Sequence, residues 1–133
     1  MKIKVGVMII LITALLSTVT LVAHHSVSAL YDAQKSIKIE GTIISFSFRS
    51  PHSLLIVEAP DSEGKMKRWD VAWNAARELA GQNITRESIK SGDKVVISGN
   101  PGRRPEDHIV RMVTFLRPSD GLTWGSRAGE TFR

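Results

Sequence analysis

The sequence predicts an all-β domain with one short helix, a small OB-like five-stranded barrel behind an N-terminal signal peptide. Two observations favour the barrel. The body of the chain alternates apolar and polar residues with a period of two, and its predicted elements follow in the order three strands, one helix, two strands. A basic start followed by a long apolar run indicates the signal peptide. A five-stranded sandwich with another topology is the competing interpretation.

The first residues are typical of a secretory signal peptide. Two lysines stand among the first four residues, and residues 5–22 carry no charge, a run long enough to cross a bilayer if it is not removed. Cleavage after Ala23 starts the mature chain at His24, whereas cleavage after Ala29 discards both histidines of the Ala-His-His-Ser segment. Residue types alone favour the site after Ala29, and an uncleaved anchor is the third alternative.

Charge and cysteine content restrict the class of protein. The formal net charge is +5, and removal of the signal peptide with its two lysines lowers it to +3. Such a mild excess argues against a nucleic-acid partner, whose binding protein would gather its basic residues on one face. The chain has no cysteine. An exported domain of this size must then be held together by packing alone, as in a compact sheet or barrel.

The first strand is expected to be long and bent. Residues 36–48 alternate apolar and polar side chains, with Ile37 and Ile39 in one phase. The apolar residues that follow take the opposite phase: Ile44, Phe46 and Phe48. The change of phase starts at Gly41, which predicts a glycine-assisted bulge or bend that lets one strand serve two sheet surfaces.

The next two strands are predicted from apolar content. A proline-held turn at residues 49–52 precedes a short strand at 53–59 that is apolar on both faces and therefore central. The third strand places Trp69, Val71 and Trp73 on one face. Two tryptophans could form a stacking platform for bases or sugars, but a face shared with valine favours the core.

A short helix and two strands complete the predicted domain. Asn74 is expected to cap a helix at residues 75–80, with Gly81 in the left-handed conformation at its end. Strands follow at 94–99 and 108–116. The predicted segments are a signal peptide (1–23), a lead-in (24–35), the barrel (36–116) and an irregular tail (117–133).

Several short motifs, in this order, resemble a bacterial exported family, the domain-of-unknown-function family 6152. They are Ala-His-His-Ser (23–26), Tyr-Asp and a Gly-Thr strand (31–43), Ser-Pro-His (50–52) and Thr-Arg-Glu-Ser-Ile-Lys-Ser-Gly-Asp (85–93). The similarity runs from Ala23 to about Leu116, and the chain departs from the family pattern at Ser50, usually Asn, and at Gln82, commonly Trp. The resemblance implies an exported OB-like domain and supplies no activity. A family motif inside a discarded peptide would be odd, so the resemblance favours cleavage after Ala23.

The four histidines of the mature chain are candidate metal ligands. A terminal His24 offers its α-amine and its imidazole, and His25, His52 or His108 could add a nitrogen for copper or zinc. His52 and His108 fall in the two loops that flank the usual ligand face of an OB barrel. We predict that copper(II) binds more tightly than zinc and that the affinity falls as the histidines become protonated. Solvated histidines without a metal role are the alternative.

Arginines in the same two loops are candidate anion ligands. Arg49, Arg103 and Arg104 could hold a phosphate, a carboxylate or an anionic glycan, because the guanidinium fork matches such groups. Loop solubility is the plainer explanation of the same residues.

The sequence predicts a protein that is not an enzyme. It has no cysteine nucleophile, no Gly-x-Ser-x-Gly elbow, no phosphate loop and no His-Glu-x-x-His motif. Two functions stay open for an exported, periplasmic or secreted bacterial protein that meets the membrane only through its signal segment. One is a binding module for a metal ion or a small anionic ligand. The other is a structural or protein-interaction protein of the envelope with no small ligand.

Overall fold

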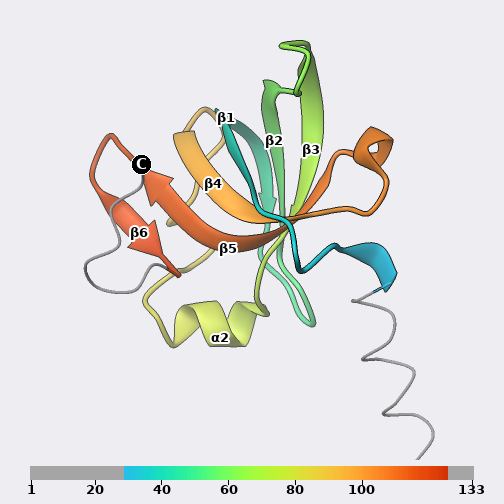
Figure 1. Cartoon of the computed structure of the whole chain (residues 1–133). Coiled ribbons are helices and arrows are strands. Elements are labelled where there is room, and N and C mark those ends of the chain that lie inside the picture. Colours follow the sequence, from blue (N-terminus) through green and yellow to red (C-terminus); the bar gives the residue numbers. More distant parts are fainter. Residues whose placement is uncertain (1–28, 126–133) are drawn as a thin grey trace, which may run out of the picture. The chain divides into compact units, whose positions relative to one another are not determined.

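The strands of the computed structural model close into a barrel (Figure 1). The structure describes residues 29–125, so the predicted signal peptide, His24 and His25 lie outside the described part. The elements are β1 (Ile37–Ser47), β2 (Leu54–Pro60), β3 (Met66–Ala72), α2 (Ala76–Ala80), β4 (Lys94–Pro101), a 3₁₀ turn (Pro105–Asp107), β5 (Ile109–Arg117) and β6 (Leu122–Trp124). Among the described residues, no helix is long and apolar enough to span a membrane.

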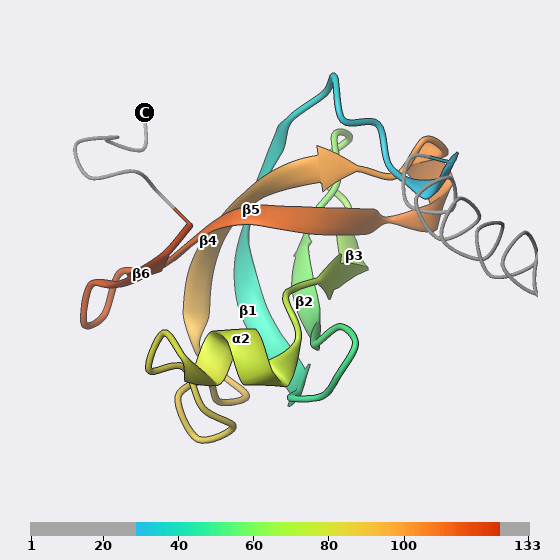
Figure 2. The ribbon, with the colours of Figure 1, turned by 90° about the horizontal axis from the view of Figure 1, so that it is seen from below.

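The strand order confirms the predicted OB-like barrel. Neighbouring strands run β3-β2-β1-β4-β5-β6, and all of these pairs are antiparallel. The start of β5 also pairs with the end of β3 in parallel, which closes the first five strands into a ring. Figure 2 shows β5 running across β1, β2 and β3, as expected for the two sides of a small barrel.

Gly41 lies at the bend of β1, as predicted. The strand pairs with β4 from Ile37 to Thr42 and with β2 from Thr42 to Ser47. A Cβ atom on Gly41 would collide with the carbonyl oxygen of Glu58, so only glycine allows the strands to approach this closely.

The change of phase in β1 is a one-residue bulge at Ile44. Ile43 pairs with Val57 and Ser45 with Ile56, so Ile44 is the extra residue and is 37% exposed. The predicted second series of Ile44, Phe46 and Phe48 is therefore wrong in its first member. That series begins at the next apolar residue, Phe46, which packs against the core.

The barrel interior is filled by alternate residues of every strand. Trp69 and Val71 of β3 and Trp73, which directly follows the strand, are buried, which confirms the prediction that they belong to the core. Trp73 stacks on Phe115 of β5, with 5.4 Å between the ring centroids. At the end of the barrel that α2 covers, three further apolar side chains are buried: Leu79, Ile84 and Ile89.

The start of the helix corrects one sequence prediction. Asn74 was expected to cap it, but the N-cap is Ala75 and no side chain bonds to the first turn. Asn74 is still engaged in sheet-like pairing, because its carbonyl oxygen accepts a hydrogen bond from the Ser53 amide at 3.0 Å.

The end of the helix corrects a second sequence prediction, the left-handed conformation of Gly81. Gly81 has a right-handed conformation (φ −63°), and the left-handed residue is Asn83 (φ 61°). The Asn83 amide donates to the Ala80 carbonyl oxygen at 3.1 Å and the Ile84 amide donates to that of Leu79 at 3.0 Å, the bonding pattern of a Schellman motif. The chain thus continues for most of a turn beyond Gly81 before it reverses.

A short hairpin replaces part of the expected irregular tail. Phe115 of β5 pairs with Trp124 of β6, and the turn between the strands has Gly121 at φ 75°. Arg117 closes this hairpin by donating two hydrogen bonds to the Asp120 carboxylate, at 3.0 and 2.7 Å. A strand of three residues is too short to show a period in the sequence, so the prediction of an irregular tail failed there.

Candidate functional site

A cleft of about 640 Å³ lies between the start of β1, the β2–β3 hairpin and the loop from β4 to β5. Its volume is in the range of small-molecule sites, roughly 300–1,000 Å³. In Figure 1 the β2–β3 hairpin projects away from α2, so the cleft lies at the barrel end that the helix does not cover.

The bend in β1 explains why a cleft opens at this place. Before Thr42 the strand pairs with β4 and not with β2, so its first half separates from the β2–β3 hairpin. Ile37 and Ile39 line the cleft from the β1 side, and Lys67 and Trp69 line it from the hairpin.

Lys67 is a cation on the inner face of a barrel strand. Side chains alternate along β3, so Lys67 shares the face of the buried Trp69 and lies opposite the buried Ala59 of β2. Its side chain is half-buried. Among the described residues, it forms no hydrogen bond or ion pair, although its charge contributes to lowering the pKa of Asp61. A half-buried ammonium group without such a partner can receive an anion.

Asp61 is held as a carboxylate at the edge of the cleft. Its Oδ1 atom accepts hydrogen bonds from the backbone amides of Lys65 and Glu63, each at 2.9 Å. The bond from the Lys65 amide is the main cause that lowers the pKa of Asp61 below its usual value. The other oxygen, Oδ2, lies 4.0 Å from Nε2 of His108.

His108 fixes the β4–β5 loop against β3. It takes the left-handed conformation (φ 49°) after the 3₁₀ turn, and its carbonyl oxygen accepts a hydrogen bond from the Asp70 amide at 3.0 Å. The imidazole meets the Trp69 indole edge to face, with 5.0 Å between centroids. The Trp69 Nε1 atom donates to the Ala59 carbonyl oxygen at 3.2 Å, so the indole is a fixed floor and not a free stacking platform.

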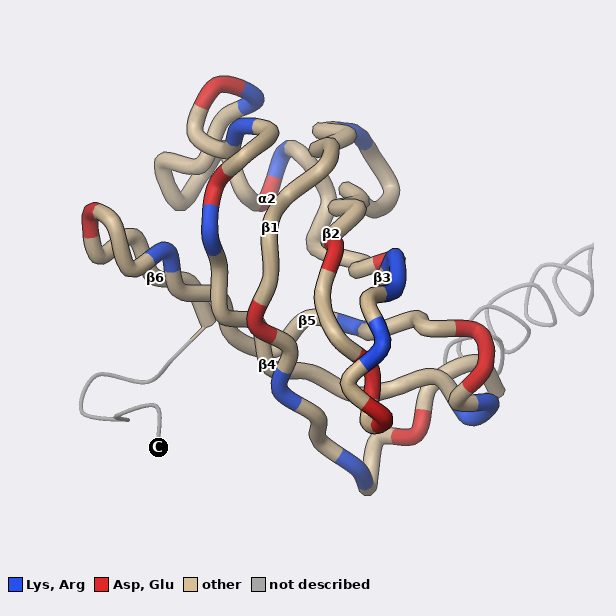
Figure 3. Tube along the Cα trace, turned by 90° about the horizontal axis from the view of Figure 1, so that it is seen from above, with Lys and Arg blue, Asp and Glu red and all other residues tan. Residues whose placement is uncertain are grey.

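The rim of the cleft carries charges of both signs. Six Lys and Arg residues and three Asp and Glu residues line the cleft, and Figure 3 shows the two signs interspersed along the chain. Most rim cations already have an anionic neighbour in an ion pair: Lys35 with Asp32, Lys38 with Glu40, Lys65 with Glu63, and Arg104 with Asp107. Lys67 differs from these four because it lies inside the cleft and has no such pair among the described residues.

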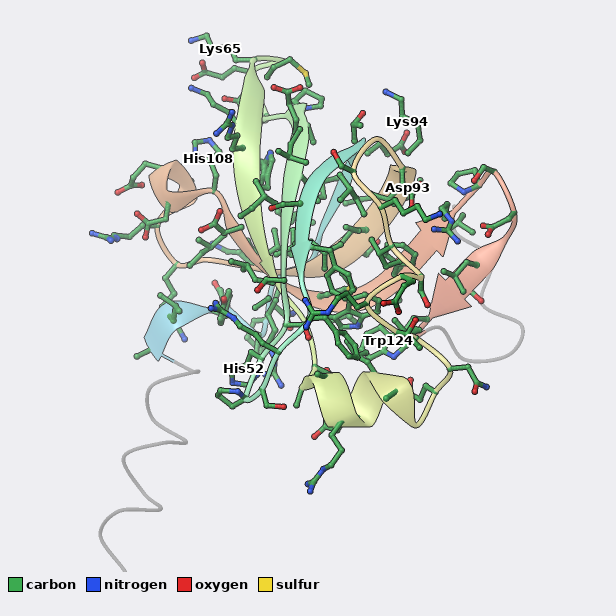
Figure 4. The ribbon with its side chains drawn as sticks, turned by 180° about the vertical axis from the view of Figure 1, so that it is seen from behind. His52, Lys65, Asp93, Lys94, His108 and Trp124 are labelled. Atoms are coloured by element: carbon green, nitrogen blue, oxygen red, sulfur yellow. The ribbon has the colours of Figure 1, made fainter. Side chains whose placement is uncertain are left out.

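The structure brings together only part of the predicted site. His108, Arg103 and Arg104 line the cleft, whereas Arg49 and His52 are exposed in the β1–β2 loop and do not line it. Figure 4 places His52 beside α2 and His108 beside the β2–β3 hairpin. The two loops therefore do not form one shared face.

The metal hypothesis stays a prediction. Within residues 29–125, no group of three or more His, Cys, Asp or Glu residues could hold a metal ion. His52 and His108 could contribute only in combination with His24 or His25, which lie outside the described residues.

Lys67 and Asp61 were not among the site residues predicted from the sequence. Lys67 precedes Trp69 by two residues, so the alternation that places the tryptophan in the core also places the lysine on the inner face. Asp61 begins the turn after β2, where aspartate commonly accepts hydrogen bonds from backbone amides two or more residues later. Both signals are local patterns that can be recognised in the sequence.

Comparison with known proteins gives one result. A family model described as a family of unknown function (DUF6152) matches residues 13–111, most of the chain. The searches of curated proteins and of solved structures found no match.

Proposed function

The chain belongs to this family of unknown function, so we propose a function on the basis of the cleft. We propose that the protein is a non-catalytic binding module for a small anionic ligand. The observation that carries the proposal is Lys67, a half-buried cation on the inner face of β3 that lines the cleft and has no hydrogen-bonding partner among the described residues. An ammonium group in such a place can form charge-assisted hydrogen bonds with an anionic ligand.

The surroundings of Lys67 support an anion. Basic residues outnumber acidic ones in the lining, and Arg103 and Arg104 reach the cleft from the β4–β5 loop. Low-dielectric walls concentrate the field of such charges and attract ligands of opposite sign. Ile37, Ile39 and Trp69 supply apolar walls on either side of the lysine.

The site chemistry supports binding without catalysis. Asp61 is the carboxylate nearest to His108 in the lining, and backbone amides hold its pKa below the usual range. A carboxyl group that acts as general acid or base near neutral pH needs a raised pKa, so Asp61 is unsuited to that role.

We propose that the protein acts in the bacterial envelope, in the periplasm or outside the cell. This part of the proposal is supported by the basic and apolar character of the first 22 residues. The intact mass of protein purified from cells would test it. A mature chain that starts at His24 is expected, and a chain that starts at Leu30 would remove the terminal amine of the metal hypothesis.

Calorimetry on the mature protein tests anion binding. We expect saturable binding of at least one anion from a panel of inorganic phosphate, galacturonate and octanoate, and a loss of at least tenfold in affinity in Lys67→Gln. Lys90→Gln is the matched control, because Lys90 is exposed and does not line the cleft. Equal binding by both variants would exclude the cleft as the site.

A protein-interaction function is the second candidate. It is favoured by β6, which within the described residues pairs only with β5 and so leaves one strand edge for another chain. Failure of the wild-type protein to bind any anion of the panel would favour this candidate over the first.

A further inference from the structure

We infer that the cleft takes an amphipathic monoanion, a carboxylate carried on an aliphatic body, whose charged group pairs with Lys67. The inference rests on the proposed anion-binding function and adds the chemical class of the ligand. Three features of the cleft carry it: the number of available cations, the composition of the walls and the state of the aromatic floor.

The available positive charge suits one anionic group. Four of the six basic residues of the lining have an ion-pair partner, and Lys67 alone among the lysines has none within the described residues. A second anionic group would also meet Asp61, Glu63 and Glu106, which line the same cleft. Like charges repel, so these carboxylates disfavour a ligand with more than one anionic group.

The walls suit an aliphatic body. Ile39 is almost fully buried, Ile37 and Ile109 are half-buried, and all three line the cleft. Three prolines also line it: Pro60, Pro101 and Pro105. Proline has no backbone N–H group, so these wall segments offer a ligand apolar surface and few hydrogen-bond donors.

The aromatic floor does not suit a sugar. Carbohydrate and base ligands commonly stack on an exposed aromatic face, but the Trp69 ring is 8% exposed and meets the His108 imidazole. Its one polar atom, Nε1, is already bonded to the Ala59 carbonyl oxygen. An aliphatic chain needs neither a stacking face nor a donor, and it matches the isoleucine walls better than a uronate would.

A series of n-alkanoates tests the inference by calorimetry on the mature protein. From butanoate to octanoate, we expect the affinity to rise about fourfold for each added methylene group, the factor that corresponds to ~0.8 kcal/mol per buried CH₂. Ile37→Ala should flatten this slope, whereas Val113→Ala should preserve it, because Val113 is exposed on β5 and does not line the cleft. A slope unchanged in Ile37→Ala would overturn the placement of the aliphatic body.

Lys67 variants separate this inference from the proposed function. Lys67→Gln should weaken octanoate binding at least tenfold, and uncharged 1-octanol should bind far more weakly than octanoate to the wild type. If phosphate or galacturonate binds through Lys67 and octanoate gains nothing over butanoate, the anion function stands and the amphipathic ligand is excluded. The anion function itself fails if octanoate and 1-octanol bind with equal affinity to the wild type and to Lys67→Gln. It also fails if the wild type binds none of these ligands.

Anionic vesicles distinguish a free amphiphile from a membrane surface. Phosphatidylglycerol vesicles present similar chemistry on a lipid bilayer, and we expect the mature protein not to sediment with them. Sedimentation that Lys67→Gln abolishes would overturn the free ligand and assign the cleft to a lipid headgroup.

Discussion

The two ends of the barrel differ in which residues lie on the inner face of the sheet and in whether α2 covers them. At the end covered by α2, the closed end, Leu79, Ile84 and Ile89 extend the core to the helix. At the other end, the open end, the inner face of β3 continues from Trp69 to Lys67, and α2 does not cover it. The same alternation therefore supplies packing where the barrel is covered and a charged cleft where it is not. An inward-facing lysine marks the open end, where we propose that a ligand binds.

Trp69→Ala should cause the largest loss in free energy of unfolding, and it tests whether the two ends differ as described. The indole is buried and forms the floor between core and cleft, so its loss should lower the free energy of unfolding by ~3–5 kcal/mol. Urea denaturation measures the change. A loss under about 1 kcal/mol would mean that the open end has no packed floor.

Leu79→Ala is the matching change at the closed end. The side chain is fully buried under the barrel, and its truncation should cost ~2–4 kcal/mol. Ligand affinity should not change, since Leu79 does not line the cleft. A parallel loss of binding in the folded variant would show that the two ends are not independent.

Asn83 sharpens the description of the closed end. Asn83→Ala should lower the free energy of unfolding by about 1–2 kcal/mol, because alanine is strained in the left-handed conformation. Asn83→Gly should be close to neutral, since glycine adopts that conformation freely. Equal losses in both variants would place the cost in the lost asparagine side chain and not in the backbone.

Lys67→Met should slightly raise the free energy of unfolding, whereas the substitutions at Trp69 and Leu79 lower it. Replacement of a half-buried charge by an apolar side chain of similar length should raise the free energy of unfolding by about 0.5–1 kcal/mol while it abolishes anion binding. Denaturation and calorimetry on the same preparation measure both. A variant less stable than the wild type would make Lys67 a structural residue.

Acid pH tests the Asp120–Arg117 pair, for which we expect the smallest effect. The hydrogen bonds donated by Arg117 lower the pKa of Asp120 to about 2, below its ordinary value of ~3.9. A lowered folded-state pKa stabilises the protein above pH ~4, and this contribution disappears as the pH falls through about 2. Asp120→Asn should thus be less stable than the wild type at pH 5, and the difference should be much smaller at pH 2, where the Asp120 carboxyl group is about half protonated. A difference as large at pH 2 as at pH 5 would exclude the carboxylate as its cause.

Local patterns predicted the parts of the fold that depend on local geometry. Alternation identified the buried face of Trp69, Val71 and Trp73, and the glycine in β1 identified the bend. The end of the helix was not predictable in the same way. Which residue takes the left-handed conformation there depends on the burial of Ile84 and on the hydrogen bond from its amide to the Leu79 carbonyl oxygen, and a glycine in the sequence indicates neither.

The candidate site depends on contacts between distant segments, and for this reason the sequence showed only half of it. His108, Arg103 and Arg104 were found by residue type, but their neighbours Asp61 and Lys67 come from a hairpin far away in the chain. His52 was grouped with them because its loop was expected to flank the same face. The loop lies instead at the start of β2, whereas the cleft lies at the end of β2.

The pairing that closes the barrel also determines when in folding the cleft can exist. Ile37 pairs with Gly99, and Asp70 pairs with Ile109, so closure joins segments separated by a large part of the chain. Non-local pairing of this kind slows folding, because the entropy of a long loop is lost before the contacts form. The hairpin that carries Lys67 depends on local pairing, whereas the β1 and β5 walls of the cleft depend on the non-local pairs. A newly made chain is therefore expected to form this hairpin before it forms the cleft, so the cleft appears only when the barrel closes.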